Sequence, residues 1–132
     1  MKANYQMQAI PANGVQVTVE GGLVRILFNF SKVKPSKDKD AEHPTADDLY
    51  DCESIDVPGR SKGAIISAIV ADRYSTDSTL AILANFAKAQ DKDSELPDAK
   101  RAEYIAEYAA YQDWRSRAKE VASIVIDIIT EA

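Results

Sequence analysis

Residues 98–132 read DAKRAEYIAEYAAYQDWRSRAKEVASIVIDIITEA and contain neither proline nor glycine. Aromatic, aliphatic and alanine side chains recur there three or four positions apart, which is the spacing of one helix face. A helix of about 33 residues would be about 50 Å long at 1.5 Å per residue. Because a domain of this size is only about 30 Å across, such a helix would extend beyond its own core. The recurring residues are Tyr104, Tyr108, Tyr111, Trp114, Ala118, Val121, Val125 and Ile128.

The excess length predicts either that this helix breaks or that its exposed half packs on another chain. We expect Tyr108, Tyr111 and Trp114 to fill the core, because aromatic residues on a helix stripe usually do so. The predicted partner-binding surface begins at Trp114 and includes Val121, Val125, Ile128 and Ile129. A competing interpretation is that residues 123–130, rich in β-branched valine and isoleucine, form a last strand.

The N-terminal third predicts β-structure. Apolar and polar residues alternate over residues 5–10, 15–20 and 24–31, as they do in a strand with one buried face. The dipeptides Asn13-Gly14 and Gly21-Gly22 separate these runs and are typical of tight hairpin turns. We therefore predict an antiparallel meander in which successive strands pair. A weaker alternation over residues 49–57 indicates a fourth strand, at the edge of the sheet.

Two shorter helices are expected before the long one. Ser61 can cap a helix that continues to Tyr74, and residues 75–78 can cap a second. The second helix carries an apolar stripe, and residues 91–97 connect it to the long helix; the stripe is Leu80, Leu83, Ala84 and Ala87. The predicted fold class is α+β: a three- to four-stranded antiparallel meander sheet packed against two short helices and one long C-terminal helix. Residues 1–132 form a single domain, with a strand half (1–57) and a helical half (58–132).

Composition and charge limit the class of protein. The chain has 132 residues, 45% of them hydrophobic and 28% charged, which is typical of one soluble domain. Residues 34–56 carry most of the net charge of −5, and residues 34–48 predict a long acidic loop. This balance argues against general nucleic-acid binding. No run is apolar enough for a membrane span or a secretory signal, and the lone cysteine excludes an internal disulfide.

No catalytic, metal or cofactor site is expected. His43 and Cys52 lie in the acidic stretch, where neighbouring carboxylates disfavour the thiolate that a thiol enzyme needs. Residues 38–42 and 91–95 each begin like a calcium-binding loop, with acids at alternate positions. Neither continues with the glycine at position six and the acid at position twelve that such a loop requires.

Two charged segments are candidate contact sites. Arg60, Ser61 and Lys62 lie at the start of the first helix, where free backbone N–H groups can contact an anion; a turn with a serine cap explains the same residues. The acidic stretch 47–56 is either a solvated segment or a patch that docks on a basic partner. Its candidate contact residues are Asp47, Asp48 and Asp51.

Three stretches carry a resemblance to known proteins. Residues 68–75 (AIVADRYS), 80–86 (LAILANF) and 108–119 (YAAYQDWRSRAK) resemble small proteins encoded in phages and prophages of gut Bacteroidales. The last stretch is also similar to a helix of tail-fibre assembly factors. The resemblance covers roughly the C-terminal half and includes no catalytic residue. It implies a role in the virion or its assembly, in the tail or connector region.

These observations lead to two functional hypotheses. The first is a non-enzymatic phage structural or assembly protein that acts through protein–protein contacts, with copies of itself or with other virion proteins. The alternative is a phage-encoded acidic inhibitor of a host defence protein that mimics nucleic acid. Both place the protein in the virion or the host cytoplasm, and neither requires a cofactor, a nucleic acid or a membrane.

Overall fold

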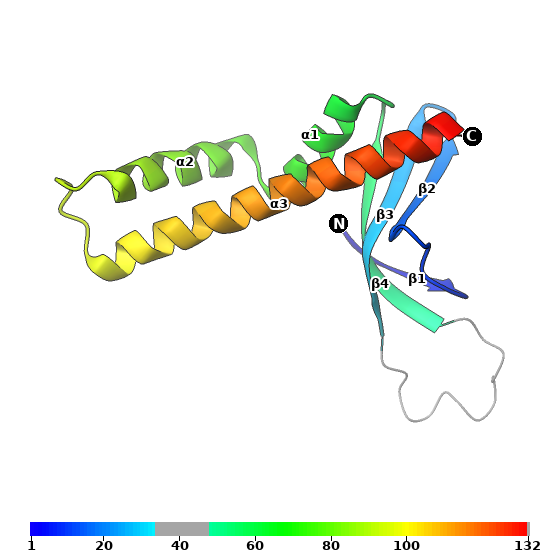
Figure 1. Ribbon diagram of the computed structural model, residues 1–132, viewed down its shortest axis with the longest axis horizontal. Coiled ribbons are helices and arrows are strands. Elements are labelled where there is room, and N and C mark those ends of the chain that lie inside the picture. Colours follow the sequence, from blue (N-terminus) through cyan, green and yellow to red (C-terminus); the bar gives the residue numbers. More distant parts are fainter. Residues whose placement is uncertain (34–47, 132) are drawn as a thin grey trace.

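The computed structural model describes residues 1–33 and 48–131 and confirms an α+β fold (Figure 1). Four antiparallel strands come first and three helices follow. The strands are β1 (Lys2–Met7), β2 (Val15–Glu20), β3 (Leu23–Lys32) and β4 (Asp48–Val57); the helices are α1 (Lys62–Arg73), α2 (Thr76–Gln90) and α3 (Asp98–Glu131). Of the predicted acidic loop 34–48, all but its last residue lies outside the described residues.

The strand order is β1-β4-β3-β2, so the predicted meander pairing is only partly correct. The β2–β3 hairpin forms as expected, with Glu20 opposite Leu23 and Gly21 at a φ of 59°. The first two strands, however, do not pair, because Asn13-Gly14 closes only a local turn in which the Gly14 N–H donates to the Pro11 carbonyl. Residues 8–14 are long enough to cross the about 14 Å between the outer strands, and β1 pairs with β4 instead.

Strand β4 lies in the interior of the sheet, which corrects its predicted edge position. It pairs with β1 on one side and β3 on the other. Both of its faces are covered in part: Tyr50 and Cys52 are buried on one face, and Ile55 and Val57 on the other. Three of its four acidic residues, Asp48, Glu53 and Asp56, pair with basic residues on the neighbouring strands.

One face of the sheet carries the core. Helix α1 lies against β4, and the C-terminal half of α3 crosses toward β2 (Figure 1). Between them lie the residues of one continuous apolar cluster, in which side chains from the strands meet those of both helices. This cluster comprises Val15, Val24, Ile26, Phe28, Ile55, Val57, Ile65, Ile69, Trp114, Ala118, Val121, Ala122 and Val125.

The C-terminal segment is one helix of 34 residues, so the interpretation of residues 123–130 as a strand is wrong. Val121, Ala122 and Val125 are all fully buried, at the spacing of a helix face and not of a strand. The predicted overhang also exists. The N-terminal half of α3 leaves the sheet and pairs with α2, and the two project together (Figure 1). We call α2 and residues 98–112 of α3 the arm.

Candidate interaction surface

The predicted partner-binding residues Trp114, Val121 and Val125 belong to the chain's own core. Their exposed fractions are 5%, 0% and 0%, which corrects their assignment to an interface. The half of α3 that overhangs is the N-terminal half, and these residues lie in the half that covers the sheet. Ile128 and Ile129 are half-buried, and Ile129 packs against the core cluster.

Trp114 joins the arm to the sheet. Its Nε1–H donates to the Ile69 carbonyl oxygen of α1 at 3.0 Å. Its ring lies 5.8 Å from that of Phe28 on β3, and the Arg73 guanidinium stacks 3.6 Å from the ring centroid. The residue therefore holds α1, α3 and the sheet together, which agrees with the expectation that it fills the core.

The two helices of the arm meet along one seam. Phe86 of α2 stacks on Tyr108 of α3 with ring centroids 3.7 Å apart, and Tyr111 meets Tyr74 edge-on at 5.1 Å. At the tip, the Arg101 guanidinium donates to the carbonyl oxygens of Ala89, Asp91 and Ser94. These donations satisfy carbonyls at the end of α2 and in the connection to α3, which have no partner within a helix.

A second apolar stripe of α2 lies on the outside of the arm. The stripe that the sequence indicates is exposed, with Leu80 60% and Leu83 42% accessible. The seam is made instead by residues one or two positions away, including Phe86 and the buried Ala89. On α3, Ile105 is likewise 42% exposed. Helix α2 thus carries apolar residues on both sides, although it packs on α3 with only one.

The exposed residues of the two helices share one side of the arm. Successive residues of a helix are rotated by about 100° around the helix axis. Leu83 therefore lies about 100° around α2 from Ile82, which faces α3. Ala109 lies about 100° around α3, in the same sense of rotation, from Tyr108, which faces α2. Because the helices run antiparallel, the same sense of rotation points to the same side of the hairpin. We call this side the apolar face; it consists of Leu80, Leu83, Ala87, Ala102, Ile105 and Ala109.

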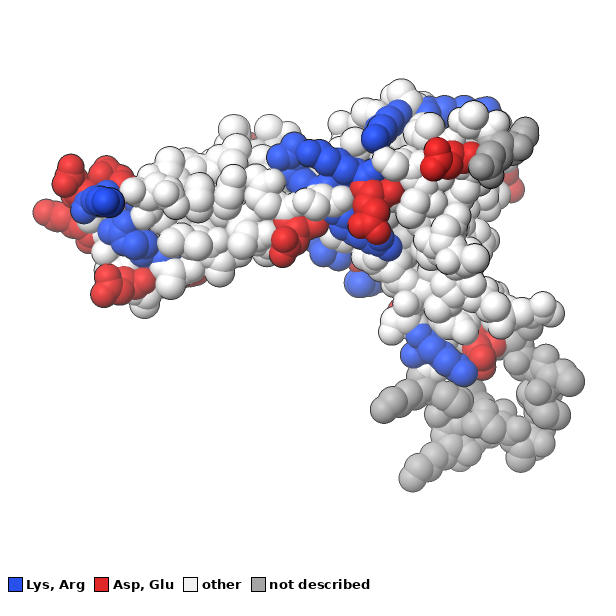
Figure 2. All heavy atoms as spheres, in the orientation of Figure 1, with Lys and Arg blue, Asp and Glu red and all other residues white. Residues whose placement is uncertain are grey.

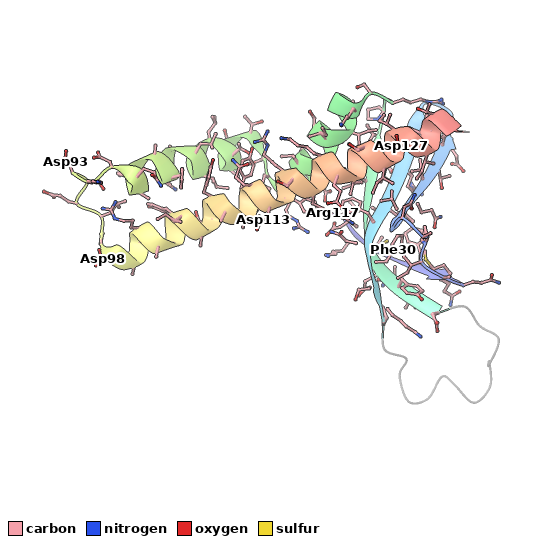
Figure 3. The ribbon with its side chains drawn as sticks, viewed as in Figure 1. Phe30, Asp93, Asp98, Asp113, Arg117 and Asp127 are labelled. Atoms are coloured by element: carbon pink, nitrogen blue, oxygen red, sulfur yellow. The ribbon has the colours of Figure 1, made fainter. Side chains whose placement is uncertain are left out.

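Charged residues surround the apolar face without interrupting it. The same helical geometry places Asp98 and Asp113, labelled in Figure 3, at its two ends. Figure 2 shows one side of the arm on which uncharged atoms extend from the charged tip to the junction with the sheet, where both basic and acidic side chains gather. The opposite side carries an ion pair of 3.2 Å between Lys100 and Glu103.

Within the described part of the acidic stretch, most carboxylates have basic partners. Asp48 pairs with Lys32 at 3.1 Å, and Asp56 pairs with Arg25 at 2.8 Å. The partners come from the adjacent strand β3, so they could not be seen as neighbours in sequence. Asp51 is exposed, and Asp47 and His43 lie outside the described residues.

Glu53 is the buried member of this stretch, with an exposed fraction of 2%. Its carboxylate accepts from Lys2 Nζ at 2.9 Å, from Arg73 Nη2 at 2.9 Å and from the amino group of Met1 at 3.3 Å. The amino group of Met1 also contacts Asp72. Burial by itself raises the pKa of the Glu53 carboxyl, but the hydrogen bonds from these cations outweigh it and leave the pKa below its ordinary value.

The predicted helix cap at Ser61 is confirmed. Its Oγ accepts from the Ala64 N–H at 3.1 Å and occupies the N-cap position of α1. Arg60 and Lys62 on either side are exposed. The serine therefore has a structural role, and an anion contact at Arg60, Ser61 and Lys62 stays a prediction.

Two hollows lie near the start of β1. One, of about 510 Å³, has walls from β1, β4 and α1 that include Ala3, Ser54 and Ala68. The other, of about 190 Å³, is a groove on the sheet face away from the helices, beside Arg25 and Asp56. That face also buries Cys52, and this burial, together with Glu53 and Asp51, raises the pKa of its thiol. A raised pKa keeps the thiol in its unreactive protonated form.

Across residues 1–33 and 48–131, no group of His, Cys, Asp and Glu side chains is arranged to hold a metal ion. In the same ranges, no helix combines the length and the apolar character that a membrane span requires.

Comparison of the chain with protein-family models, curated proteins and solved structures finds no match. Function is therefore inferred from the surfaces described above.

The candidate surface that sequence reasoning missed is the apolar face of the arm. Its signal was present in α2, where Leu80 and Leu83 lie on one side and Ile82 and Phe86 on another. A helix that packs on a single neighbour needs only one such side. A second side indicates a second packing partner, and in the chain itself no described residue covers Leu80.

Proposed function

We propose that the protein acts without catalysis of its own, through protein–protein contacts made by the apolar face of the arm. The observation that carries this proposal is the exposure of Leu80, Leu83 and Ile105 on one side of a projecting two-helix hairpin. Full burial of an aliphatic side chain of this size contributes about 1.5–3 kcal/mol. Contiguous apolar patches bordered by charged residues mark interaction sites in many proteins.

We propose further that the protein is a structural or assembly component of a phage particle, in the tail or connector region. The three stretches that resemble phage and prophage proteins lie within or next to α1, α2 and α3, and two of them contribute to the arm. A compact end that carries a projecting apolar arm is suited to joining subunits. In this role the protein would be found in the virion or in the host cytoplasm during assembly.

The ion pairs of the acidic stretch favour this role over that of a nucleic-acid mimic. A mimic of a phosphate backbone needs acidic groups that are free to meet a basic partner. Asp48 and Asp56 are engaged by Lys32 and Arg25, and Glu53 is buried. Among the described residues, this leaves Asp51 as the exposed acid of the stretch to which the salt bridges assign no basic partner.

The test is incorporation into particles. Particles purified from a producing strain are analysed by quantitative mass spectrometry for the wild-type chain and for the double variant Leu80→Glu/Leu83→Glu. We expect the wild type at a fixed ratio to known particle proteins and the variant at least tenfold depleted. The matched control is Leu23→Glu, at a residue of β3 that is 47% exposed and lies outside the arm. Normal particles that lack the wild-type chain, or equal incorporation of all three proteins, would contradict the proposal.

A further inference from the structure

We propose that the apolar face is covered by the same face of a second copy of this chain, with the two arms antiparallel so that they form a four-helix bundle. This inference rests on the proposed function, because it names the occupant of the same surface. It commits to a partner with the same shape, the same apolar residues and the complementary charge at each end. Area, charge and residue size each support this arrangement.

The first argument is the area of the apolar face. Helix α2 has 15 residues and is therefore about 22 Å long. Two helices side by side are about 20 Å wide, which gives a flat footprint of about 450 Å² on each copy. The summed footprint of two copies approaches the buried area of about 1,000 Å² that a specific interface needs. The footprint treats the face as flat and leaves out the additional area of the protruding side chains. A single docking helix would cover about half of the face, whereas a second two-helix arm matches all of it.

The second argument is charge. Residues 91–98, at the tip of the arm, carry four acidic residues and one basic residue. Residues 113–120, where α3 reaches the sheet, carry three basic and two acidic residues, and one of each, Arg117 and Glu120, form an ion pair of 2.8 Å. Antiparallel arms place the strongly acidic tip of each copy beside the weakly basic junction of the other, whereas parallel arms place the two acidic tips together. Asp98 of one copy then lies at the same end of the face as Asp113 of the other, so the preference comes from the net charge of the two ends and not from that pair.

The third argument is the size pattern along α2. Leu83 is at the middle of the helix, and Leu80 and Ala87 lie at nearly equal distances on either side of it. A two-fold axis across the middle of the arm therefore places Leu80 of one copy opposite Ala87 of the other. Large side chains then meet small ones, which is the arrangement that fills an interface without voids. A parallel pair would have its two-fold axis along the helices and would place α2 of one copy against α3 of the other.

The experiment uses disulfide cross-linking of the full chain under mild oxidation. Leu83→Cys lies beside the proposed two-fold axis, and Thr76→Cys lies at one end of the same side of α2. A disulfide requires Cβ atoms within about 4.5 Å, and the two copies of position 76 would be about 22 Å apart in antiparallel arms. We expect Leu83→Cys to give mainly covalent dimer and Thr76→Cys to give none.

Two controls make the outcome specific. The wild type has only the buried Cys52 and should not cross-link, and Leu23→Cys, on the exposed part of β3, reports random collisions. Addition of Ile105→Glu to Leu83→Cys should abolish the dimer while circular dichroism shows unchanged helix content. Cross-linking of both Leu83→Cys and Thr76→Cys would overturn the antiparallel arrangement. Absence of cross-linking at Leu83→Cys would overturn the proposed antiparallel pair of copies.

The proposed function can survive the failure of this inference. If Leu83→Cys does not cross-link but Leu80→Glu/Leu83→Glu still fails to enter particles, the arm joins the protein to the particle through an occupant other than an antiparallel second copy. If Leu83→Cys cross-links and the same glutamate variant enters particles normally, the second copy is correct and the arm is not what joins the protein to the particle.

Discussion

Glu53 brings charge into the interior at the point where β1, β4 and α1 meet. Its carboxylate is 2% exposed and is contacted by Lys2, Arg73 and the amino group of Met1. Arg73 in turn stacks on Trp114. A buried carboxylate is tolerated only when such partners satisfy it, so the cluster links the N-terminal strand to the helical layer.

Replacement of this carboxylate tests that link. We expect Glu53→Gln to lower the free energy of unfolding by about 2 kcal/mol, because charged hydrogen bonds to a buried group are lost. Asp56→Asn is the matched control, since it removes an exposed ion pair with Arg25 and should cost less than about 1 kcal/mol. Urea unfolding of both variants provides the measurement. An equal decrease in the free energy of unfolding of the two variants would show that the buried Glu53 carboxylate stabilises the fold no more than the exposed Asp56 does.

The same carboxyl predicts part of the acid sensitivity. Its folded-state pKa lies below the ordinary value of 4.5, so as the pH falls the unfolded chain takes up the proton first. The stabilisation by Glu53 is therefore complete above pH 4.5 and is lost as the pH falls through the lower folded-state pKa. We expect the stability difference between wild type and Glu53→Gln to shrink over this range. A difference that stays constant down to about pH 2.5 would contradict the assignment.

Among the elements, the connection between α2 and α3 depends on one side chain. Arg101 donates to carbonyls at the end of α2 and to the Ser94 hydroxyl oxygen. These bonds fix the turn that sends α3 back alongside α2 and so hold the two halves of the apolar face in register.

Removal of that side chain should loosen the tip of the arm. We expect Arg101→Ala to make the amides of Asp91 and Ser94 exchange about tenfold faster, which corresponds to about 1.4 kcal/mol of local stability. Hydrogen–deuterium exchange provides the measurement, with Lys100→Ala as control because Lys100 pairs with the exposed Glu103. Unchanged exchange in Arg101→Ala would mean that the backbone alone fixes the turn.

Local signals in the sequence predicted the elements well and their pairing less well. The Gly21-Gly22 turn and the absence of helix breakers after Pro97 correctly indicate the β2–β3 hairpin and the single helix α3. The pairing of β1 with β4 joins residues about fifty positions apart, and no turn dipeptide reports it. Asn13-Gly14 correctly predicts a turn, but a turn dipeptide does not determine whether the strands on its two sides pair with each other.

For the whole molecule, sequence length predicted the overhang of α3, but not which half overhangs. Helical periodicity identifies a face and is the same along the seam from Tyr104 to Ile128. The path of the chain determines which half of α3 overhangs. Helix α1 packs on β4, and the short link at Tyr74 and Ser75 directs α2 away from the sheet. Helix α3 then runs back toward the sheet. Only its C-terminal half can therefore cover the sheet, which buries Val121 and Val125 and leaves the surface for a partner on the arm.

Sedimentation equilibrium of the wild-type chain, from about 1 to about 200 µM, tests most directly whether the arm mediates association, because this range covers the micromolar dissociation constants of weak complexes. We predict a mass that rises to twice the 14.5 kDa of one chain, and Leu83→Glu at the mass of a single chain with the same helix content. A wild-type chain that stays at 14.5 kDa throughout, or a Leu83→Glu variant that associates as the wild type does, would contradict it.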